Sequence, residues 1–347
     1  LFSNSTETVF NEGSQDLDFR VESNGVTDAL KVDAGNDQVQ IGTGADLITA
    51  SAGTSNVRIG VNAGNSIQSG GNYNVVVGDE AGTAISTGDD NTAVGYNSLS
   101  SNDTGFSNVA IGKDALAATT SGNTNTAVGA DALTTNTVGD KSVAVGYEAL
   151  KVQNPATNTD MFNTAVGFNA GVSVTTGLRN TFLGGLSGDA FTEATDNVAL
   201  GYNTLTTDTL GSHSVAVGAF SLVVQNQTTA TNVYNTAVGA SAGRAVTTAT
   251  RSVLLGGLSG DALTTGSRNS VIGYNALGAD TTGERATALG YGALQSQNFA
   301  TTTQNYNVAL GYNAGGSITT GVQNTLVGAI TGDSLTDADS NIAIGYA

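Results

Sequence analysis

An aliphatic residue followed by glycine recurs along most of the chain, and this repeat constrains the fold more than any other feature. The spacing between successive glycines is 18 residues once and then 17, with 21 at three places. Repeats this short do not accommodate a helical unit and are typical of parallel β-solenoids, in which each repeat is one coil. We call these residues the coil glycines: Gly60, Gly78, Gly95, Gly112, Gly129, Gly146, Gly167, Gly184, Gly201, Gly218, Gly239, Gly256, Gly273, Gly290, Gly311, Gly328 and Gly345.

The three long coils create a second period and help to define the domains. They begin at Gly146, Gly218 and Gly290, so each block of four coils contains 72 residues. We expect residues 46–347 to form a repeat shaft with coils of 17–18 residues and three coils of 21. We expect residues 1–45 to form a separate region of short strands, with turns at 24–25 and 35–36.

The coil containing residues 91–99 illustrates the predicted interior. We expect two short strands and two turns per coil, with the aliphatic residue before the coil glycine buried and the small residue before that, usually Ala, allowing close packing. Asparagine stands four positions before the coil glycine in 13 of 17 coils. Stacked asparagine amides can form a hydrogen-bonded ladder, and asparagine tolerates left-handed backbone. The coil glycine itself fits a bend that other residues would resist.

The coils fall into two types that differ four residues after the coil glycine. Each Gly-type coil has an apolar residue three positions later, and each Leu-type coil is polar there, so we expect one apolar anchor per coil from one of two places. The Leu-type residues are Leu99, Leu116, Leu133, Leu150, Leu205, Leu222, Leu277 and Leu294. The Gly-type residues are Gly64, Gly82, Gly171, Gly188, Gly243, Gly260, Gly315 and Gly332.

Composition excludes several classes of function. The formal net charge of -18 disfavours nucleic-acid binding, and no apolar run reaches the ~20 residues that span a bilayer. Cysteine is absent and His213 is the only histidine, which leaves no disulfide, thiolate site, catalytic triad or histidine-based metal site. We therefore predict a protein that is not an enzyme and that uses no catalytic residue, metal or cofactor. The chain begins at Leu1, and we expect a piece of a longer protein.

Four other patterns have alternative interpretations. Lys141, His213 and Arg285 lie 72 residues apart and are interpreted as solvated turn residues. Residues 184–189 and 256–261 are similar to calcium-binding repeats, but the period is wrong and the aspartate does not recur in every coil. A tyrosine often follows the coil glycine and either packs over the turn or forms a sugar-binding stripe. An ice-binding threonine array and a glycan-depolymerising spike are weaker alternatives, because the threonines lie at turns and no recurrent carboxylate pair is present.

Two resemblances support a fibre. The strands Asn-Thr-Ala-Val-Gly at Asn91 and Asn125 and Ser-Val-Ala-Val-Gly at Ser142 resemble the head repeats of trimeric autotransporter adhesins, which implies a left-handed parallel β-roll with three chains around one axis. The segments 273–277 and 311–321 are similar to tail-fibre proteins of marine bacteriophages. We therefore expect an all-β, homotrimeric fibre of the virion or the cell surface that attaches to a host receptor such as a glycan, with a bacterial surface adhesin as the alternative.

The inserts of the three long coils are the candidate binding sites. Each insert opens with Gln-Asn and ends in an aromatic residue, and insertions in solenoids form loops that often bind ligands. Amide and aromatic side chains suit carbohydrate, and repetition along a trimer would add avidity. The alternative is that the inserts only decorate the shaft. The predicted binding residues are Gln153, Asn154, Phe162, Gln225, Asn226, Tyr234, Gln297, Asn298 and Tyr306.

Overall fold

The chain forms two compact units, Leu1–Ala50 and Ser51–Ala347. The computed structural model describes residues 2–3, 8–9, 19–23, 26–33, 38–41 and 51–347, and these residues contain no helix. In the first unit two antiparallel sheets form within the region where short strands are predicted, and the predicted turns at 24–25 and 35–36 lie outside the described residues. One sheet pairs β1 (Phe2–Ser3) with β2 (Thr8–Val9). The other has the strand order β3 (Phe19–Ser23), β4 (Val26–Asp33), β5 (Gln38–Ile41).

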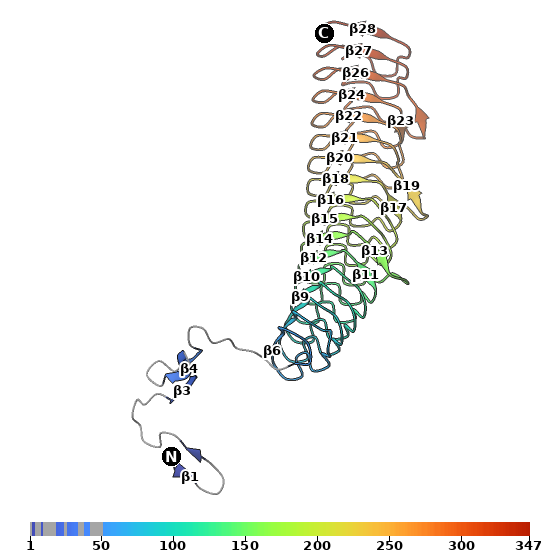
Figure 1. Ribbon diagram of the computed structural model, residues 1–347. Coiled ribbons are helices and arrows are strands. Elements are labelled where there is room, and N and C mark those ends of the chain that lie inside the picture. The colour runs from blue at the N-terminus through green and yellow to red at the C-terminus, as the bar shows by residue number, and fades with distance from the viewer. Residues whose placement is uncertain (1, 4–7, 10–18, 24–25, 34–37, 42–50) are drawn as a thin grey trace. The chain divides into compact units, whose positions relative to one another are not determined.

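The second unit is a parallel β-solenoid with about 17 residues per coil, which confirms the predicted fold class (Figure 1). Seventeen three-residue strands pair in parallel, each with the next, from β6 to β28, and at ~4.8 Å per coil they span roughly 80 Å. No pairing among the described strands joins β6 to β28. The strands are β6 (Val57–Ile59), β7 (Val75–Val77), β8 (Thr92–Val94), β9 (Val109–Ile111), β10 (Thr126–Val128), β12 (Val143–Val145), β14 (Thr164–Val166), β15 (Thr181–Leu183), β16 (Val198–Leu200), β18 (Val215–Val217), β20 (Thr236–Val238), β21 (Val253–Leu255), β22 (Ser270–Ile272), β24 (Thr287–Leu289), β26 (Val308–Leu310), β27 (Thr325–Val327) and β28 (Ile342–Ile344).

Most coils contain one strand, where the sequence predicted two. In and just before the coil that contains residues 91–99, the backbone is left-handed at Asp90, Asn97 and Leu99, with φ of 57°, 57° and 51°. These residues interrupt extended backbone, so the second half of the coil becomes a series of turns. Its amide groups still bond from coil to coil, since the Leu99 amide donates to the Ala115 carbonyl at 2.9 Å. The backbone groups are therefore satisfied without a second sheet.

The sheet faces the opposite way from the prediction. In every coil from β7 to β27 the middle strand residue, such as Ala93, is buried. The aliphatic residue before the coil glycine is half-buried or exposed in all coils, and Leu183 is 48% exposed. Because side chains alternate across a strand, placing the small residue inside sends the aliphatic residue outside. The prediction that the aliphatic column is buried is wrong.

The predicted asparagine ladder is present inside the solenoid. The Asn91 Oδ1 accepts from the Asn108 amide at 3.0 Å, and the Asn91 Nδ2 donates to the Gly105 carbonyl at 2.8 Å. The left-handed backbone falls on the residue before each ladder asparagine, as at Asp90, and not on the asparagine itself. The ladder asparagines therefore supply hydrogen bonds to buried polar groups of the coil. The left-handed turn that was predicted for them is formed by the residue before.

The bend predicted at the coil glycines is confirmed by geometry. Gly95 has φ of 126°, and a Cβ atom on it would lie 2.8 Å from the carbonyl carbon of Gly112 in the next coil. Both the positive φ and the close approach of stacked coils therefore require glycine.

Candidate binding surface on the inserted coils

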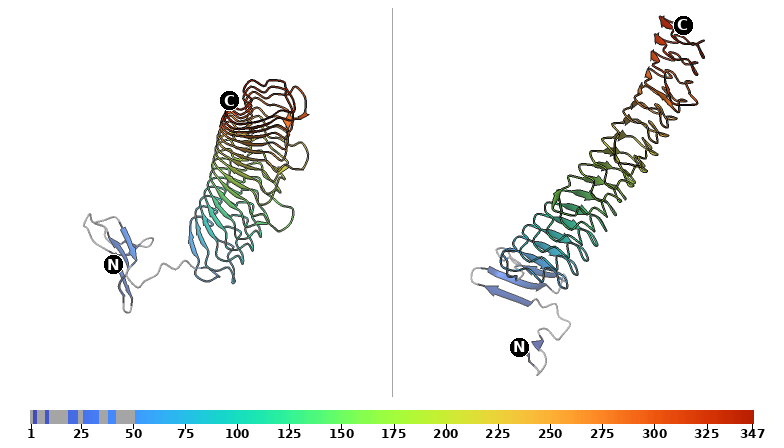
Figure 2. Two further views of the ribbon diagram at one scale, coloured as in Figure 1. Left: turned by 90° about the horizontal axis from the view of Figure 1, so that it is seen from above. Right: turned by 90° about the vertical axis from the view of Figure 1, so that its right-hand side faces the viewer.

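The three 21-residue coils carry extra loops on one side of the solenoid (Figures 1 and 2). In each, a two-residue strand of the long coil pairs in parallel with one of the preceding coil, and the loop just before it protrudes. The pairs are β11 (Gly139–Asp140) with β13 (Thr159–Asp160), β17 (Gly211–Ser212) with β19 (Thr231–Asn232), and β23 (Gly283–Glu284) with β25 (Thr303–Gln304). The same local geometry thus recurs every four coils, ~19 Å apart.

The insert glutamines lie inside the solenoid. Gln153, Gln225 and Gln297 are fully buried. Their side-chain oxygens accept from the ladder asparagines of the following strand, with Asn163 donating to Gln153 at 2.9 Å. The ladder position just before each long coil is Ser142, Ser214 or Ala286 in place of asparagine, and the glutamine of the long coil reaches across to bond the asparagine of the next strand. The glutamines therefore complete the interior ladder.

Two of the buried glutamines also bond to carboxyl groups. The Gln225 Nε2 donates to Asp208 at 2.6 Å, and Gln297 bonds to Asp280 in the same way at 2.6 Å. Burial raises the pKa of both aspartates, although the donated hydrogen bonds oppose the rise. In the first block Asn136 stands at this position, and it bonds to Gly139 instead.

The insert asparagines are exposed and bond locally. The Asn154 Oδ1 accepts from the Thr137 hydroxyl at 2.7 Å, and Asn298 accepts from Thr281 at 3.0 Å. Asn226 accepts from Thr209 at 3.4 Å. Each asparagine thus fixes the start of its loop against the preceding coil and keeps its amide nitrogen free of these bonds.

The insert aromatics lie on the surface beside the three basic residues that share their 72-residue spacing. Phe162 is 51% exposed, with the Lys141 ammonium 5.4 Å from its ring centre. Tyr234 is 49% exposed and lies 4.9 Å from the His213 ring, measured between ring centres. The sequence analysis treated the two sets separately. They meet because both occupy the position five residues before successive coil glycines, a coincidence that the repeat alignment could have revealed.

The third pair shows the same arrangement with an added hydrogen bond. The Arg285 guanidinium lies 5.3 Å from the centre of the Tyr306 ring and donates to its hydroxyl at 2.6 Å. Tyr306 is 45% exposed and has a left-handed φ of 53°. Cation–π contacts at exposed sites contribute ~0.5–1 kcal/mol, so Lys141 and Arg285 each help to hold the facing ring in a defined orientation.

The tyrosines that follow the coil glycines form a second aromatic surface. Tyr274, Tyr291 and Tyr312 stack in consecutive coils with ring centres 5.5 Å apart. Their rings are about half exposed, and they lie beside the outward-facing aliphatic column. Packing between coils therefore accounts for this stripe.

The segments 184–189 and 256–261, which are similar to calcium-binding repeats, do not bring carboxylates together. Asp189 and Asp261 belong to separate coils, and burial raises the pKa of each carboxyl group. Among the described residues no group of three or more His, Cys, Asp or Glu could hold a metal ion. Within the same part of the chain no helix is long and apolar enough to cross a membrane.

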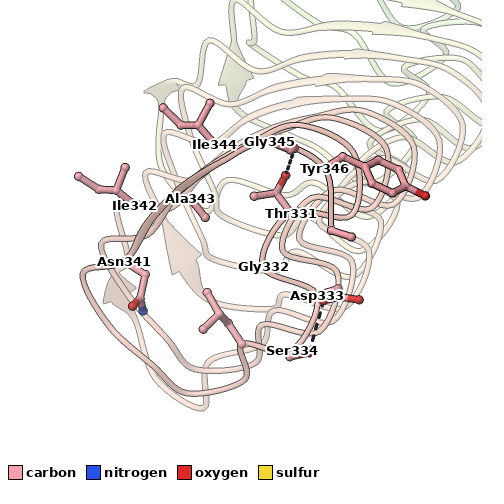
Figure 3. Close-up of a pocket in the computed structure, with 12 residues that line it drawn as sticks. Thr331, Gly332, Asp333, Ser334, Asn341, Ile342, Ala343, Ile344, Gly345 and Tyr346 are labelled. Atoms are coloured by element: carbon pink, nitrogen blue, oxygen red, sulfur yellow. Dashed lines mark hydrogen bonds between the residues drawn. The ribbon is translucent and has the colours of Figure 1, made fainter.

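A cavity of about 410 Å³ lies at the last coil, lined by residues 331–335 and 341–347 (Figure 3). Ile342 and Ile344 project from β28 beside it, and the Thr331 hydroxyl donates to the Gly345 carbonyl at 2.8 Å. The cavity follows the edge of the final strand, so it is the open end of the solenoid core.

Comparisons with protein-family models, with curated proteins and with solved structures found no match to this chain.

Proposed function

We propose that the chain is the shaft of a structural and adhesive fibre, and specifically of a bacteriophage tail fibre that mediates attachment to a host surface. The observation that carries this proposal is the repetition of one loop-bearing coil on one side of an ~80 Å solenoid, at intervals of four coils. A rigid rod with repeated surface loops suits multivalent attachment, in which weak contacts add as avidity. The similarity of 311–321 to phage tail fibres favours the phage over the alternative, a bacterial trimeric surface adhesin.

A binding role agrees better than a depolymerising one with the placement of the buried carboxyl groups. Asp208 and Asp280 lie four coils apart, ~19 Å, whereas paired glycosidase carboxylates lie ~5–9.5 Å apart. Both side chains are also buried and engaged by glutamines. We therefore place attachment on the exposed asparagines and aromatics of the inserts.

We further propose that three copies of the chain associate through the outer face of the long sheet. This face carries the aliphatic residues before the coil glycines, among them Leu183 and Leu289, which are 48% and 42% exposed. With the tyrosines that follow, it is ~80 Å long and ~13 Å wide, roughly 1,000 Å² per chain, against ~800 Å² per partner in a standard interface. Sedimentation should give a trimer, and a stable folded monomer would contradict the association.

The inserts provide the test of attachment. Residues 154–161 and their two equivalents are replaced with the four-residue segment that the 17-residue coil has at 120–123. The variant should keep its β-rich circular dichroism spectrum and lose competition with virions for host cells. Undiminished competition would refute the proposed role of the loops. A matched control carries Thr120→Ala and Thr124→Ala, at two exposed positions of a 17-residue coil, which leaves all three loops intact.

The location of the protein distinguishes phage from bacterium. Antibodies against residues 51–347 should label the tails of virions in electron micrographs. Label on bacterial envelopes instead would favour the adhesin, and label on neither would contradict both.

A further inference from the structure

Five consecutive coils present aromatic, arginine, arginine, arginine and aromatic side chains in one column. We call Tyr234, Arg251, Arg268, Arg285 and Tyr306 the basic–aromatic column. Each residue precedes a position of the buried ladder and has left-handed backbone, with φ of 57°, 59°, 63°, 64° and 53° in that order. The shared backbone geometry stacks the five positions along the fibre axis over ~19 Å.

The column concentrates positive charge on an acidic molecule. The whole chain has 11 Lys and Arg residues against 29 Asp and Glu, yet three arginines occupy adjacent coils here, ~4.8 Å apart. Like charges at this separation repel one another. A surface that brings them together is suited to an anion that bridges them.

Carboxyl groups of the protein neutralise little of this charge. Glu284 lies 3.5 Å from Arg268. Arg251 is exposed and forms no ion pair with any described residue. Arg285 donates to Tyr306, and its buried Nε has no hydrogen-bond partner in the described part of the chain. Three guanidinium groups therefore face one carboxylate, and donors remain free.

At the equivalent positions of the preceding coils, aspartates pair with the basic residues, so the molecule itself offers a comparison. Asp160 bonds to Lys141 at 2.7 Å. Asp196 bonds to Arg179 at 2.6 Å, and its pKa is lowered by that hydrogen bond. Asp196 also lies 3.6 Å from His213. The upstream basic residues thus have acidic partners, and the downstream arginines largely lack them.

We infer that the basic–aromatic column binds an acidic polysaccharide lying along the fibre axis. Guanidinium groups bind carboxylate or sulfate in a bidentate manner, and an exposed tyrosine at each end offers a face for a sugar ring. Single-stranded nucleic acid is the less suitable polyanion, because its successive bases stack on closely spaced aromatics and these rings lie four coils apart. The inference deepens the proposed attachment function and rests on it for its biological setting.

The test is a binding measurement on the isolated full chain, so its result is independent of whether the chain belongs to a virion. Fluorescent polygalacturonate, dextran sulfate, neutral dextran and oligo(dT) are titrated at 50 mM salt. We expect one of the acidic glycans to bind, neutral dextran not to bind, and added salt to weaken binding. The R251Q/R268Q/R285Q variant should bind at least tenfold more weakly, whereas R179Q, whose arginine has an acidic partner, should bind like the wild type.

Three results would overturn the inference: no binding of either acidic glycan, equal binding by the triple variant, or tighter binding of oligo(dT) than of both glycans. R251Q serves as the second variant if the triple variant does not fold, because within the described residues Arg251 makes only a backbone hydrogen bond, to Val233. R251Q should weaken binding at least twofold with an unchanged melting temperature, and no change in affinity would likewise count against the column. Binding of dextran sulfate but not polygalacturonate would assign the ligand as sulfated, and the reverse as carboxylated.

Discussion

Leu-type and Gly-type coils have the same backbone but fill the interior differently. Four residues after the coil glycine, Leu116 has φ of 51° and Gly188 has φ of 58°. Leucine in this left-handed conformation is strained by ~1–2 kcal/mol, and glycine is not. The leucine is fully buried, so the Leu-type coil accepts strain in return for a filled core.

Gly-type coils occur in pairs, and the middle strand residue between the two glycines of each pair packs over both of them. Phe182 is fully buried and lies over both Gly171 and Gly188, where Cβ atoms would approach its ring to 2.7 and 2.4 Å. Leu254 and Leu326 occupy the equivalent positions 72 and 144 residues later. The difference teaches that the core is shared between neighbouring coils, so neither coil type is independent of its neighbours.

Removing the shared side chain should have the largest effect. Phe182→Ala should destabilise the chain by ~3–5 kcal/mol, because it opens a cavity over two glycines that cannot fill it. Chemical denaturation measures the change in unfolding free energy. Thr181→Ala, on the outer face of the same strand, is the control and should change stability by less than ~1 kcal/mol. A loss of under 1 kcal/mol for Phe182→Ala would mean that the pair does not share its core.

Converting a Leu-type coil should have a smaller effect. Leu116→Gly removes a buried side chain, which costs ~2–5 kcal/mol, and relieves left-handed strain of ~1–2 kcal/mol, so we expect a net loss of ~1–3 kcal/mol. Adding Thr119→Ile supplies the apolar residue of a Gly-type coil but breaks the hydrogen bond from Thr119 to Asn136. The double variant should recover part of the loss in thermal melts, and no recovery would contradict the two-type model.

The asparagine ladder is common to both coil types, so breaking it should cost the same in either. Asn108→Ala, in a Leu-type coil, removes the partners of the Asn125 amide and the Gly122 carbonyl. Asn180→Ala, in a Gly-type coil, does the same to the Asn197 amide and the Ala194 carbonyl. We expect a loss of ~1–3 kcal/mol for each, as for other unsatisfied buried groups. Losses differing by more than ~1 kcal/mol would show that the ladder is coupled to the coil type.

The smallest expected effect concerns pH. Asp208 and Asp280 both lie in Leu-type coils, and burial raises the pKa of each carboxyl group. A carboxyl group with a raised pKa in the folded state contributes stability that is complete below its unfolded pKa of ~3.9 and is lost as pH rises through the folded pKa. Relative to D208N/D280N, which mimics Asn136, the wild type should therefore gain stability as pH falls from 7 toward 4. Melting temperatures whose difference does not change with pH would contradict this assignment.

The sequence alone determined the all-β class, the coil length, the asparagine ladder, the bend at the coil glycines and the two coil types. These features depend on residues that repeat at constant spacing, and stacking in register converts such spacing directly into columns. The pairing of Phe182 with two glycines was also present in the sequence, but it becomes meaningful only when neighbouring coils are known to share a core.

Only the tertiary structure decided which way the sheet faces and which columns meet. Ala93 and Val94 are both apolar, so composition could not assign the interior, and the pleat required that one of them face outward. In Leu-type coils the alanine shares the core with a fully buried leucine, as Ala93 does with Leu99. Likewise Gln153 resembled a surface residue until its reach to Asn163 placed it inside, and the basic–aromatic column emerged only when left-handed corners of successive coils were stacked. These outcomes depend on distances across and between coils, which a linear pattern does not contain.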